Sequence, residues 1–270
     1  MNNINVCVVQ MKVVNDKNKN LDKAIKYIKE ASSKNCDMII LPEMFICPYE
    51  NNKFREYSEP QGGSSFTTLS KVAKENDVYL VCGSMPEIDS DDNLYNTSYV
   101  FDRNGDLIAK HQKMHLFDID LPNGKSVYES DVLTAGDNVC VFDSEFGKIG
   151  LCICYDLRFV ELSRAMINKG AKAIIVPGAF NMTTGPAHWE LLFKSRAVDN
   201  QVYTIGCAPS RDSECSYVSY GNSIIVSPWG EIVSRLDENE GCLYSQIDFD
   251  YVDKIRNKLP LLKHRRLELY

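Results

Sequence analysis

The chain has 270 residues, of which 44% are hydrophobic, and it carries a formal net charge of −7. This length suits one large domain or two small ones, and the apolar share is enough for a substantial core. The acidic balance, with no block of Lys or Arg, argues against nucleic acid as a partner. No apolar run approaches the length of a membrane span and the N-terminus has no targeting pattern, so we expect a cytoplasmic protein that does not bind membranes.

The ten cysteines are scattered through strand-like segments. They form no Cys-x-x-Cys motif and no Cys/His cluster with zinc spacing. This distribution is typical of buried free thiols in a reducing compartment. We therefore expect neither disulfides nor a metal site.

Short apolar runs alternate with stretches of helical spacing along the whole chain. The helix expected at 20–33, for example, places Leu21, Ala24 and Ile28 on one face. Alternating strands and helices, without a linker or repeat, predict one α/β domain with mixed sheets. In chain order we expect a strand at 4–9, the helix at 20–33, a strand at 38–41, a helix at 64–74, strands at 78–82, 94–102 and 107–110, a loop region at 111–137, strands at 139–142 and 149–154, a helix at 161–169, a strand at 173–176, a helix at 185–200, strands at 202–207, 222–226, 232–235 and 243–247, and a helix at 250–257.

The segment at 150–159 is the strongest candidate for a catalytic element. Its apolar run ends at Cys154, polar residues follow, and Phe159 then opens a helical pattern. A thiol at a strand-to-helix turn is held rigidly and can still be reached, and cysteine is a strong nucleophile at neutral pH. The alternative is that Cys154 is a buried structural thiol like the other cysteines.

Three other apolar strands also end in residues that could be functional. Glu43 follows Pro42 directly, Lys113 lies at the end of a hairpin strand, and Phe180 follows a Pro-Gly turn. Sites in α/β proteins gather at such strand ends. Taken singly, however, each segment is more typical of a surface carboxylate, a solvated lysine or an ordinary turn.

Together these residues form a chemical set. Glu43 could accept the Cys154 proton if burial raises its pKa, and Lys113 could stabilise both the thiolate and an oxyanion. The backbone N–H of Tyr155 would be a second oxyanion donor. The rival arrangement is a Cys–His pair, but the sequence ties none of the four histidines to Cys154.

Glu43, Lys113 and Cys154 stand in the order and local contexts of the Glu-Lys-Cys triad of the nitrilase superfamily of carbon–nitrogen hydrolases. The chain resembles this superfamily over nearly its whole length, from 4–6 to 265–270. Within it, the chain is most similar to the omega-amidases. The segments that carry this narrower resemblance lie at 115–120, 177–190 and 195–201.

The resemblance implies a four-layer α-β-β-α sandwich in a single domain over residues 1–270, with a core at about 4–248 and a tail at 249–270 at a subunit interface. It further implies a homodimer that uses no metal or organic cofactor. The expected substrates are the omega-amides of 2-oxo acids, 2-oxoglutaramate and 2-oxosuccinamate. Hydrolysis through a Cys thioester would give 2-oxoglutarate or oxaloacetate plus ammonia.

The resemblance also assigns supporting residues. Glu129 matches a second glutamate near the triad, which orients Lys113 or assists the base. Arg158 matches an arginine that holds a substrate carboxylate, a task that suits a bidentate guanidinium; its alternative is a helix-surface pair with Glu161. Further matching positions in the binding pocket are Tyr49, Phe180 and Thr184.

Two other functions stay open at this stage. The same triad serves enzymes that hydrolyse deaminated glutathione, and other amidases or carbamoylases of the superfamily. A non-catalytic dimeric interaction module is an alternative of another class, which the intact Glu-Lys-Cys set disfavours. One departure is Cys152, which stands where relatives usually carry a small residue and is expected to pack behind the Cys154 turn.

Overall fold

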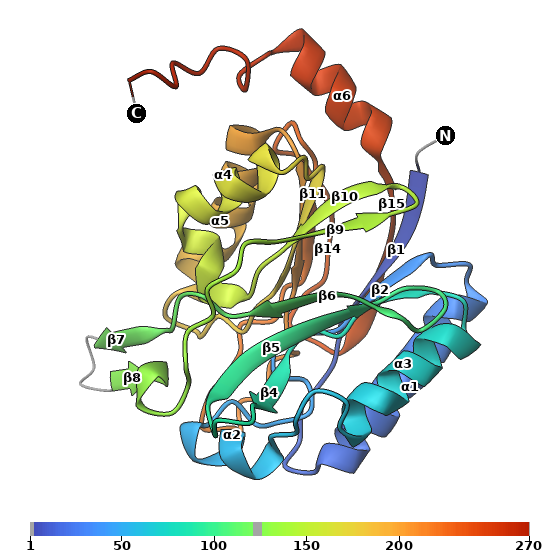
Figure 1. Ribbon diagram of the computed structural model, residues 1–270, viewed down its shortest axis with the longest axis vertical. Coiled ribbons are helices and arrows are strands. Elements are labelled where there is room, and N and C mark those ends of the chain that lie inside the picture. Colours follow the sequence, from blue (N-terminus) through green and yellow to red (C-terminus); the bar gives the residue numbers. More distant parts are fainter. Residues whose placement is uncertain (1–2, 121–125, 270) are drawn as a thin grey trace.

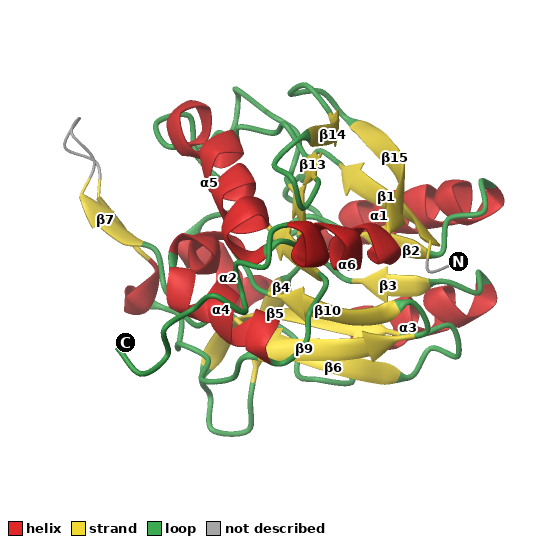
Figure 2. Cartoon of the chain, turned by 90° about the horizontal axis from the view of Figure 1, so that it is seen from above, coloured by secondary structure: helices red, strands yellow, loops and turns green. Residues whose placement is uncertain are grey.

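The computed structural model describes residues 3–120 and 126–269 of the chain. Two β-sheets face each other, and helices cover the outer face of each sheet (Figures 1 and 2). The order of layers is therefore helices, sheet, sheet, helices, which confirms the expected four-layer α-β-β-α architecture.

The first sheet comes mainly from the N-terminal half of the chain. Its strand order is β15-β1-β2-β3-β5-β4, with β6 paired to β5, and β1, β2 and β3 run parallel. Helices α1 and α3 cover its outer face. The elements are β1 (Asn3–Gln10), α1 (Lys17–Ser33), β2 (Met38–Ile40), α2 (Asn51–Tyr57), α3 (Ser64–Glu75), β3 (Tyr79–Val81), β4 (Met85–Ile88), β5 (Leu94–Phe101), β6 (Leu107–Gln112) and β15 (Gly241–Asp248).

The second sheet follows in the chain and has the order β14-β13-β12-β11-β10-β9, with β10, β11 and β12 parallel. Helices α4 and α5 cover it, and α6 leads into the C-terminal segment (Figure 1). Its elements are β9 (Cys140–Ser144), β10 (Gly147–Leu151), α4 (Val160–Asn168), β11 (Ala173–Pro177), α5 (Gly185–Asn200), β12 (Tyr203–Cys207), β13 (Ile224–Val226), β14 (Ile232–Arg235) and α6 (Phe249–Lys258).

The strand sequences explain why the sheets are covered on both faces. In β1, Val6 and Val8 face the second sheet, whereas Cys7 and Val9 face the helices. Side chains alternate along a strand, so a strand buried on both sides reads as a continuous apolar run. The same rule explains β11, whose side chains divide between the core of the two sheets and the layer under α4 and α5.

The strand expected at 149–154 is shorter in the structure. β10 ends at Leu151, and Cys154 opens a 3₁₀ turn (Cys154–Arg158) with a φ of +49°. Cys152 and Ile153 are apolar because they are buried under α4 and α5, and an apolar run alone cannot show that the ladder has ended.

The loop expected at 111–137 also contains regular structure. β6 continues to Gln112, and a small antiparallel hairpin forms from β7 (Asp118–Asp120) and β8 (Ser126–Tyr128), followed by a 3₁₀ turn at Glu129–Asp131. These strands expose most of their side chains, so they carry no apolar pattern.

Two elements had no clear signal in the sequence. α2 has a mostly polar sequence and is anchored by two buried side chains, Phe54 and Tyr57, so tertiary packing outweighs pattern there. β4 contains Pro86, which an edge strand tolerates because its missing N–H can face away from the ladder.

All ten cysteines are free thiols, as expected from their spacing. Across residues 3–120 and 126–269, no helix combines the length and apolar character needed to cross a bilayer.

The core between the sheets generates a first prediction. Ile175 of β11 is fully buried there, so Ile175→Ala should lower the free energy of unfolding by about 2–5 kcal/mol through lost burial and a cavity. Denaturant unfolding measures this change. Val233→Ala on exposed β14 is the control and should change it by less than about 0.5 kcal/mol. Equal effects of the two substitutions would contradict the placement of the core.

Candidate active site

The structure brings Glu43, Lys113 and Cys154 together at one edge of the sandwich. Glu43 follows β2, Lys113 follows β6, and Cys154 lies just beyond β10. The carboxyl ends of parallel strands meet at the same edge of a sheet, which is why segments so distant in sequence converge. Glu43 and Lys113 are fully buried and Cys154 is 6% exposed, so the three groups interact in a site shielded from water.

Cys154 has a left-handed backbone conformation, which is unusual for a residue with a side chain. The segment after β11 approaches Cys154 closely at Gly178, where an added Cβ would lie 3.3 Å from the Cys154 Cα. The Cys154 thiol lies close enough to the Glu43 carboxylate for the two groups to interact. The turn thus aims the thiol at a potential base.

Glu43 is held on both carboxylate oxygens. The side-chain amide of Asn96 on β5 donates to Oε1 at 2.9 Å, and the backbone N–H of Ala179 donates to Oε2 at 2.7 Å. These bonds fix the carboxylate in one orientation.

Lys113 lies between two buried carboxylates. Its Nζ is 2.8 Å from Glu129 and 3.3 Å from Glu43. Glu129 is itself held by the backbone N–H of Phe117 at 2.7 Å and by the hydroxyl of Tyr49, which donates to it. Glu129 therefore contacts Lys113 more closely than Glu43 does.

Burial and charge shift the pKa values of all three groups. Burial raises the pKa of Glu43, with Lys113 opposing and Glu129 adding to the shift. Burial and then the charge of Glu43 raise the pKa of the Cys154 thiol well above its usual range. Burial alone would lower the pKa of Lys113, but Glu129 and Glu43 outweigh it and the pKa is raised. The resting site therefore holds a protonated thiol, a base of raised pKa and a permanently charged lysine.

A small pocket beside the thiol contains most of the expected binding residues. Arg158 lies with its guanidinium carbon 4.9 Å from the ring centre of Phe180 and 5.7 Å from that of Tyr155. One guanidinium nitrogen is 3.2 Å from Nδ1 of His188 on α5, whereas the surface alternative had predicted a pair with Glu161. The residues lining the pocket are Phe117, Cys154, Tyr155, Arg158, Ala179, Phe180, Thr184 and Tyr217.

Tyr49 lies beside the carboxylates. Its hydroxyl is 3.4 Å from Glu43 in addition to its bond to Glu129. Its ring stacks on Tyr217 with centroids 4.6 Å apart. Tyr217 lines the pocket beside the thiol and donates a hydrogen bond to the Ala179 carbonyl, so the two rings form a wall of the site.

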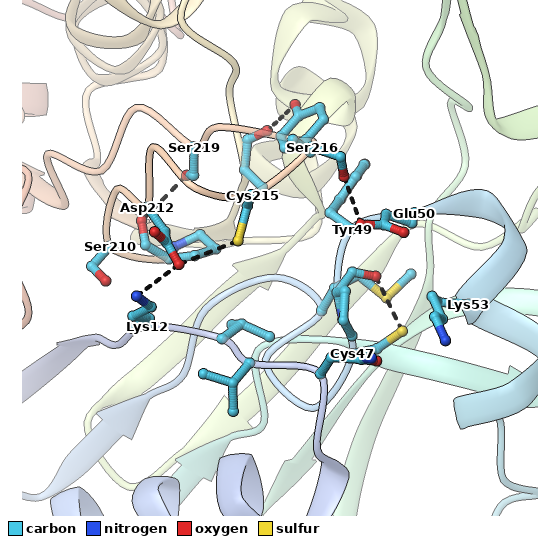
Figure 3. A pocket seen from close by; sticks show the side chains of 18 of the residues that line it. Lys12, Cys47, Tyr49, Glu50, Lys53, Ser210, Asp212, Cys215, Ser216 and Ser219 are labelled. Atoms are coloured by element: carbon cyan, nitrogen blue, oxygen red, sulfur yellow. Dashed lines mark hydrogen bonds and ion pairs between the residues drawn. The ribbon is translucent and has the colours of Figure 1, made fainter.

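A larger cavity of about 430 Å³ adjoins the site (Figure 3). Lys12 and Asp212, which form an ion pair at 2.8 Å, lie on one side of it, and Glu50 and Lys53 lie on the other. Glu43, Ala179, Tyr49 and Tyr217 also line this cavity, so it adjoins Glu43 as well as the stacked tyrosines.

Sequence reasoning missed Asn96, Phe117 and Tyr217. Asn96 lies within an ordinary strand, and its contact with Glu43 depends on the pairing of β5 with its neighbours. Tyr217 comes from the loop after β12, whose sequence has no motif that indicates a site residue.

Cys152 is fully buried behind the Cys154 turn, as expected. The part of the chain that the structure describes contains no group of three His, Cys, Asp or Glu residues arranged to hold a metal ion.

Comparison with known proteins identifies the family. The family described as carbon-nitrogen hydrolase matches residues 5–257. An omega-amidase of Xenopus laevis is 49% identical over 263 residues, covering 97% of this chain and 95% of the relative. The human omega-amidase NIT2 is 43% identical over 270 residues, covering 100% of this chain and 98% of the relative.

Solved structures agree with this. Nit3 of Saccharomyces cerevisiae, a member of the nitrilase superfamily, superposes with a TM-score of 0.90 at 41% identity, covering 98% of this chain and 97% of that chain. The NitFhit protein of C. elegans superposes with a TM-score of 0.91 at 33% identity, covering 99% of this chain and 66% of that chain. The buried Glu-Lys-Cys arrangement, the four-layer fold and these similarities together show that the chain belongs to the carbon–nitrogen hydrolase family of the nitrilase superfamily.

Proposed function

We propose that this enzyme is an omega-amidase that hydrolyses the terminal amide of 2-oxo acid amides, 2-oxoglutaramate and 2-oxosuccinamate. One observation carries the proposal: the pocket beside the Cys154 thiol contains Arg158, a cation suited to a substrate carboxylate. Relatives that cover nearly the whole chain at 43–49% identity are named omega-amidases.

The proposed reaction begins with proton transfer from Cys154 to Glu43. The thiolate attacks the amide carbon, and the Lys113 ammonium and the Tyr155 backbone N–H stabilise the negative charge that forms on the amide oxygen. Protonated Glu43 then gives its proton to the leaving nitrogen, and ammonia departs as the thioester forms.

The second half releases the acid. Glu43, again ionised, accepts a proton from water, and the resulting hydroxide attacks the thioester carbon. The carbon–sulfur bond breaks, the thiolate regains a proton from Glu43, and the dicarboxylic 2-oxo acid leaves. Glu129 and Tyr49 hold Lys113 and the carboxylates in place throughout, which the contacts of Glu129 support.

Arg158 is proposed to bind the substrate carboxylate. Its guanidinium lies over the rings of Phe180 and Tyr155, and Thr184 adds a polar group to the same pocket. This arrangement favours a short acidic chain with its amide directed at Cys154.

We also propose that the enzyme acts as a cytoplasmic homodimer with the tail at 249–270 in the interface. The exposed apolar side chains of Leu261, Leu267 and Leu269, in the segment after α6, support this. Sedimentation of the full chain tests the dimer, since a single-chain mass would contradict it.

Loss of the nucleophile gives the first prediction for activity. Cys154→Ala should reduce ammonia release from 2-oxoglutaramate by about a thousandfold or more, because no thioester can form. The melting temperature should stay close to that of the wild type.

Cys152→Ala is the matched control, since it removes a buried thiol two residues earlier and should retain most of the turnover. Mass spectrometry of the wild type with substrate should detect the acyl group on Cys154. Measurable turnover by Cys154→Ala would contradict the assignment, and the complete absence of turnover in the wild type would favour the non-catalytic module.

The contacts of Glu43 predict a change in pH dependence. Asn96→Leu removes a donor to the Glu43 carboxylate, which favours the protonated acid and raises its pKa further. Because the base must be ionised, the acid limb of the kcat/KM profile should move upward by about one pH unit. Ser98→Ala, which removes a buried hydroxyl without a hydrogen-bond partner on the same strand, should leave the profile unchanged. An acid limb that stays in place in Asn96→Leu would contradict Glu43 as the base.

Carboxylate recognition by Arg158 predicts a substrate-dependent loss. Arg158→Met should lower kcat/KM for 2-oxoglutaramate by about a hundredfold, mainly through KM, while hydrolysis of an uncharged alkyl amide changes little. Similar losses on both substrates would show that Arg158 does not bind the carboxylate.

The choice of substrate is a separate test of the proposal. In the same ammonia assay, wild-type preference for a deaminated tripeptide amide over 2-oxoglutaramate would contradict the omega-amidase proposal.

A further inference from the structure

A further buried carboxylate, Asp156, lies in the turn that begins at the candidate nucleophile. It is fully buried and accepts hydrogen bonds on both oxygens. Oδ2 accepts from Nε2 of His111 at 2.8 Å and from the Ile153 N–H at 3.0 Å. Oδ1 accepts from Nδ1 of His115 at 2.8 Å and from the His115 backbone N–H at 2.9 Å. Four donors thus converge on one carboxylate.

The donors come from the two segments that carry Lys113 and Cys154. His111 and His115 lie two residues before and two residues after Lys113. Ile153 immediately precedes Cys154, and Asp156 lies in the turn that Cys154 opens. A single carboxylate therefore joins the lysine segment to the cysteine turn.

The surroundings of Asp156 favour its ionised form. Burial alone would raise the pKa of Asp156, but the bonds from His111 and His115 outweigh it and hold the pKa well below its usual range. His111 is fully buried, and its Nδ1 has no hydrogen-bond partner among the described residues. His115 stacks on Phe159 with centroids 3.6 Å apart, so its ring is fixed as well.

The location of the cluster separates it from substrate binding. Asp156, His111 and His115 are absent from the lining of the pocket beside the thiol, and they do not form a metal-binding group. Asp156 instead accepts hydrogen bonds from the backbone N–H groups of Ile153, next to Cys154, and of His115, two residues after Lys113. The left-handed conformation of Cys154 is unfavourable by itself, and charge-assisted bonds to a buried carboxylate can offset that cost.

We infer that Asp156, together with His111 and His115, is a positioning residue that fixes Cys154 and Lys113 relative to each other. It acts through these two residues and does not touch the substrate. The inference rests on the proposed roles of Cys154 and Lys113 but not on the identity of the amide. Displacements of about 1 Å at reacting groups can cost about a hundredfold in rate, so a rigid link between the two segments matters for turnover.

A pair of substitutions at His111 tests the link. Gln places an amide donor near the position of Nε2, whereas Leu has a similar size and no donor. His111→Leu should lower kcat by about 10- to 100-fold with a smaller change in KM, and His111→Gln should restore most of kcat. Equal losses in the two variants would overturn the inference, because the hydrogen bond would then not be the cause.

Alkylation of Cys154 gives a readout that needs no substrate. Iodoacetamide is applied at fixed pH and the mass of the Cys154 peptide is followed, which separates it from the exposed Cys215. His111→Leu and Asp156→Asn should alkylate more slowly than the wild type, and His111→Gln should not.

A direct electrostatic role of Asp156 would have the opposite sign. Removing its negative charge would favour the thiolate and speed alkylation of Asp156→Asn, and that result would overturn the inference. If Asp156→Asn fails to fold, the His111 pair decides the question. Wild-type alkylation without amide hydrolysis would count against the proposed function, whereas normal wild-type hydrolysis with unaffected His111→Leu would count against the positioning role alone.

Discussion

The central constraint in this structure is the burial of one lysine between two carboxylates. Lys113 contacts Glu43 and Glu129, and all three side chains are fully buried. Isolated buried charges are very unfavourable, so each of these groups depends on the others and on the hydrogen bonds from Asn96 and Ala179. Burial is the largest cause of the raised pKa values of Glu43 and Cys154, and the charge of Glu129 adds to the first shift and that of Glu43 to the second.

The sandwich supplies the rigid frame that such a cluster requires. Glu43 comes from the first sheet, Cys154 and Ala179 from the second, and the two sheets share a continuous apolar core. A shift of one sheet against the other would separate the charges, so packing between the sheets and the electrostatics of the site stabilise the same arrangement. This coupling explains how residues more than 100 positions apart can hold fixed hydrogen-bond distances.

Much of the fold could be predicted from the sequence because buried parallel strands are continuously apolar. The helix expected at 185–200 coincides with α5, where Pro186 in the first turn gives a clear signal. The end of β10 could not be predicted, since Ile153 is buried for reasons unrelated to the strand ladder. Segments that carry Glu43, Lys113 and Cys154 stood out as strand ends. Asn96 and Asp156 did not, because their contacts depend on strand pairing and on a turn with an unusual φ.

The charges and burial around Lys113 and Glu43 determine which group transfers protons in the proposed mechanism. Two carboxylates raise the pKa of Lys113, so its ammonium stays charged and serves as an electrostatic group and not as a proton acceptor. Glu43 differs because burial raises its pKa toward the range in which a group can both accept and release a proton. Glu129 has its oxygens occupied by Lys113, Tyr49 and the Phe117 N–H, which removes it from contact with the thiol. The proposed mechanism therefore assigns proton transfer to Glu43, which contacts Lys113 and interacts with the Cys154 thiol.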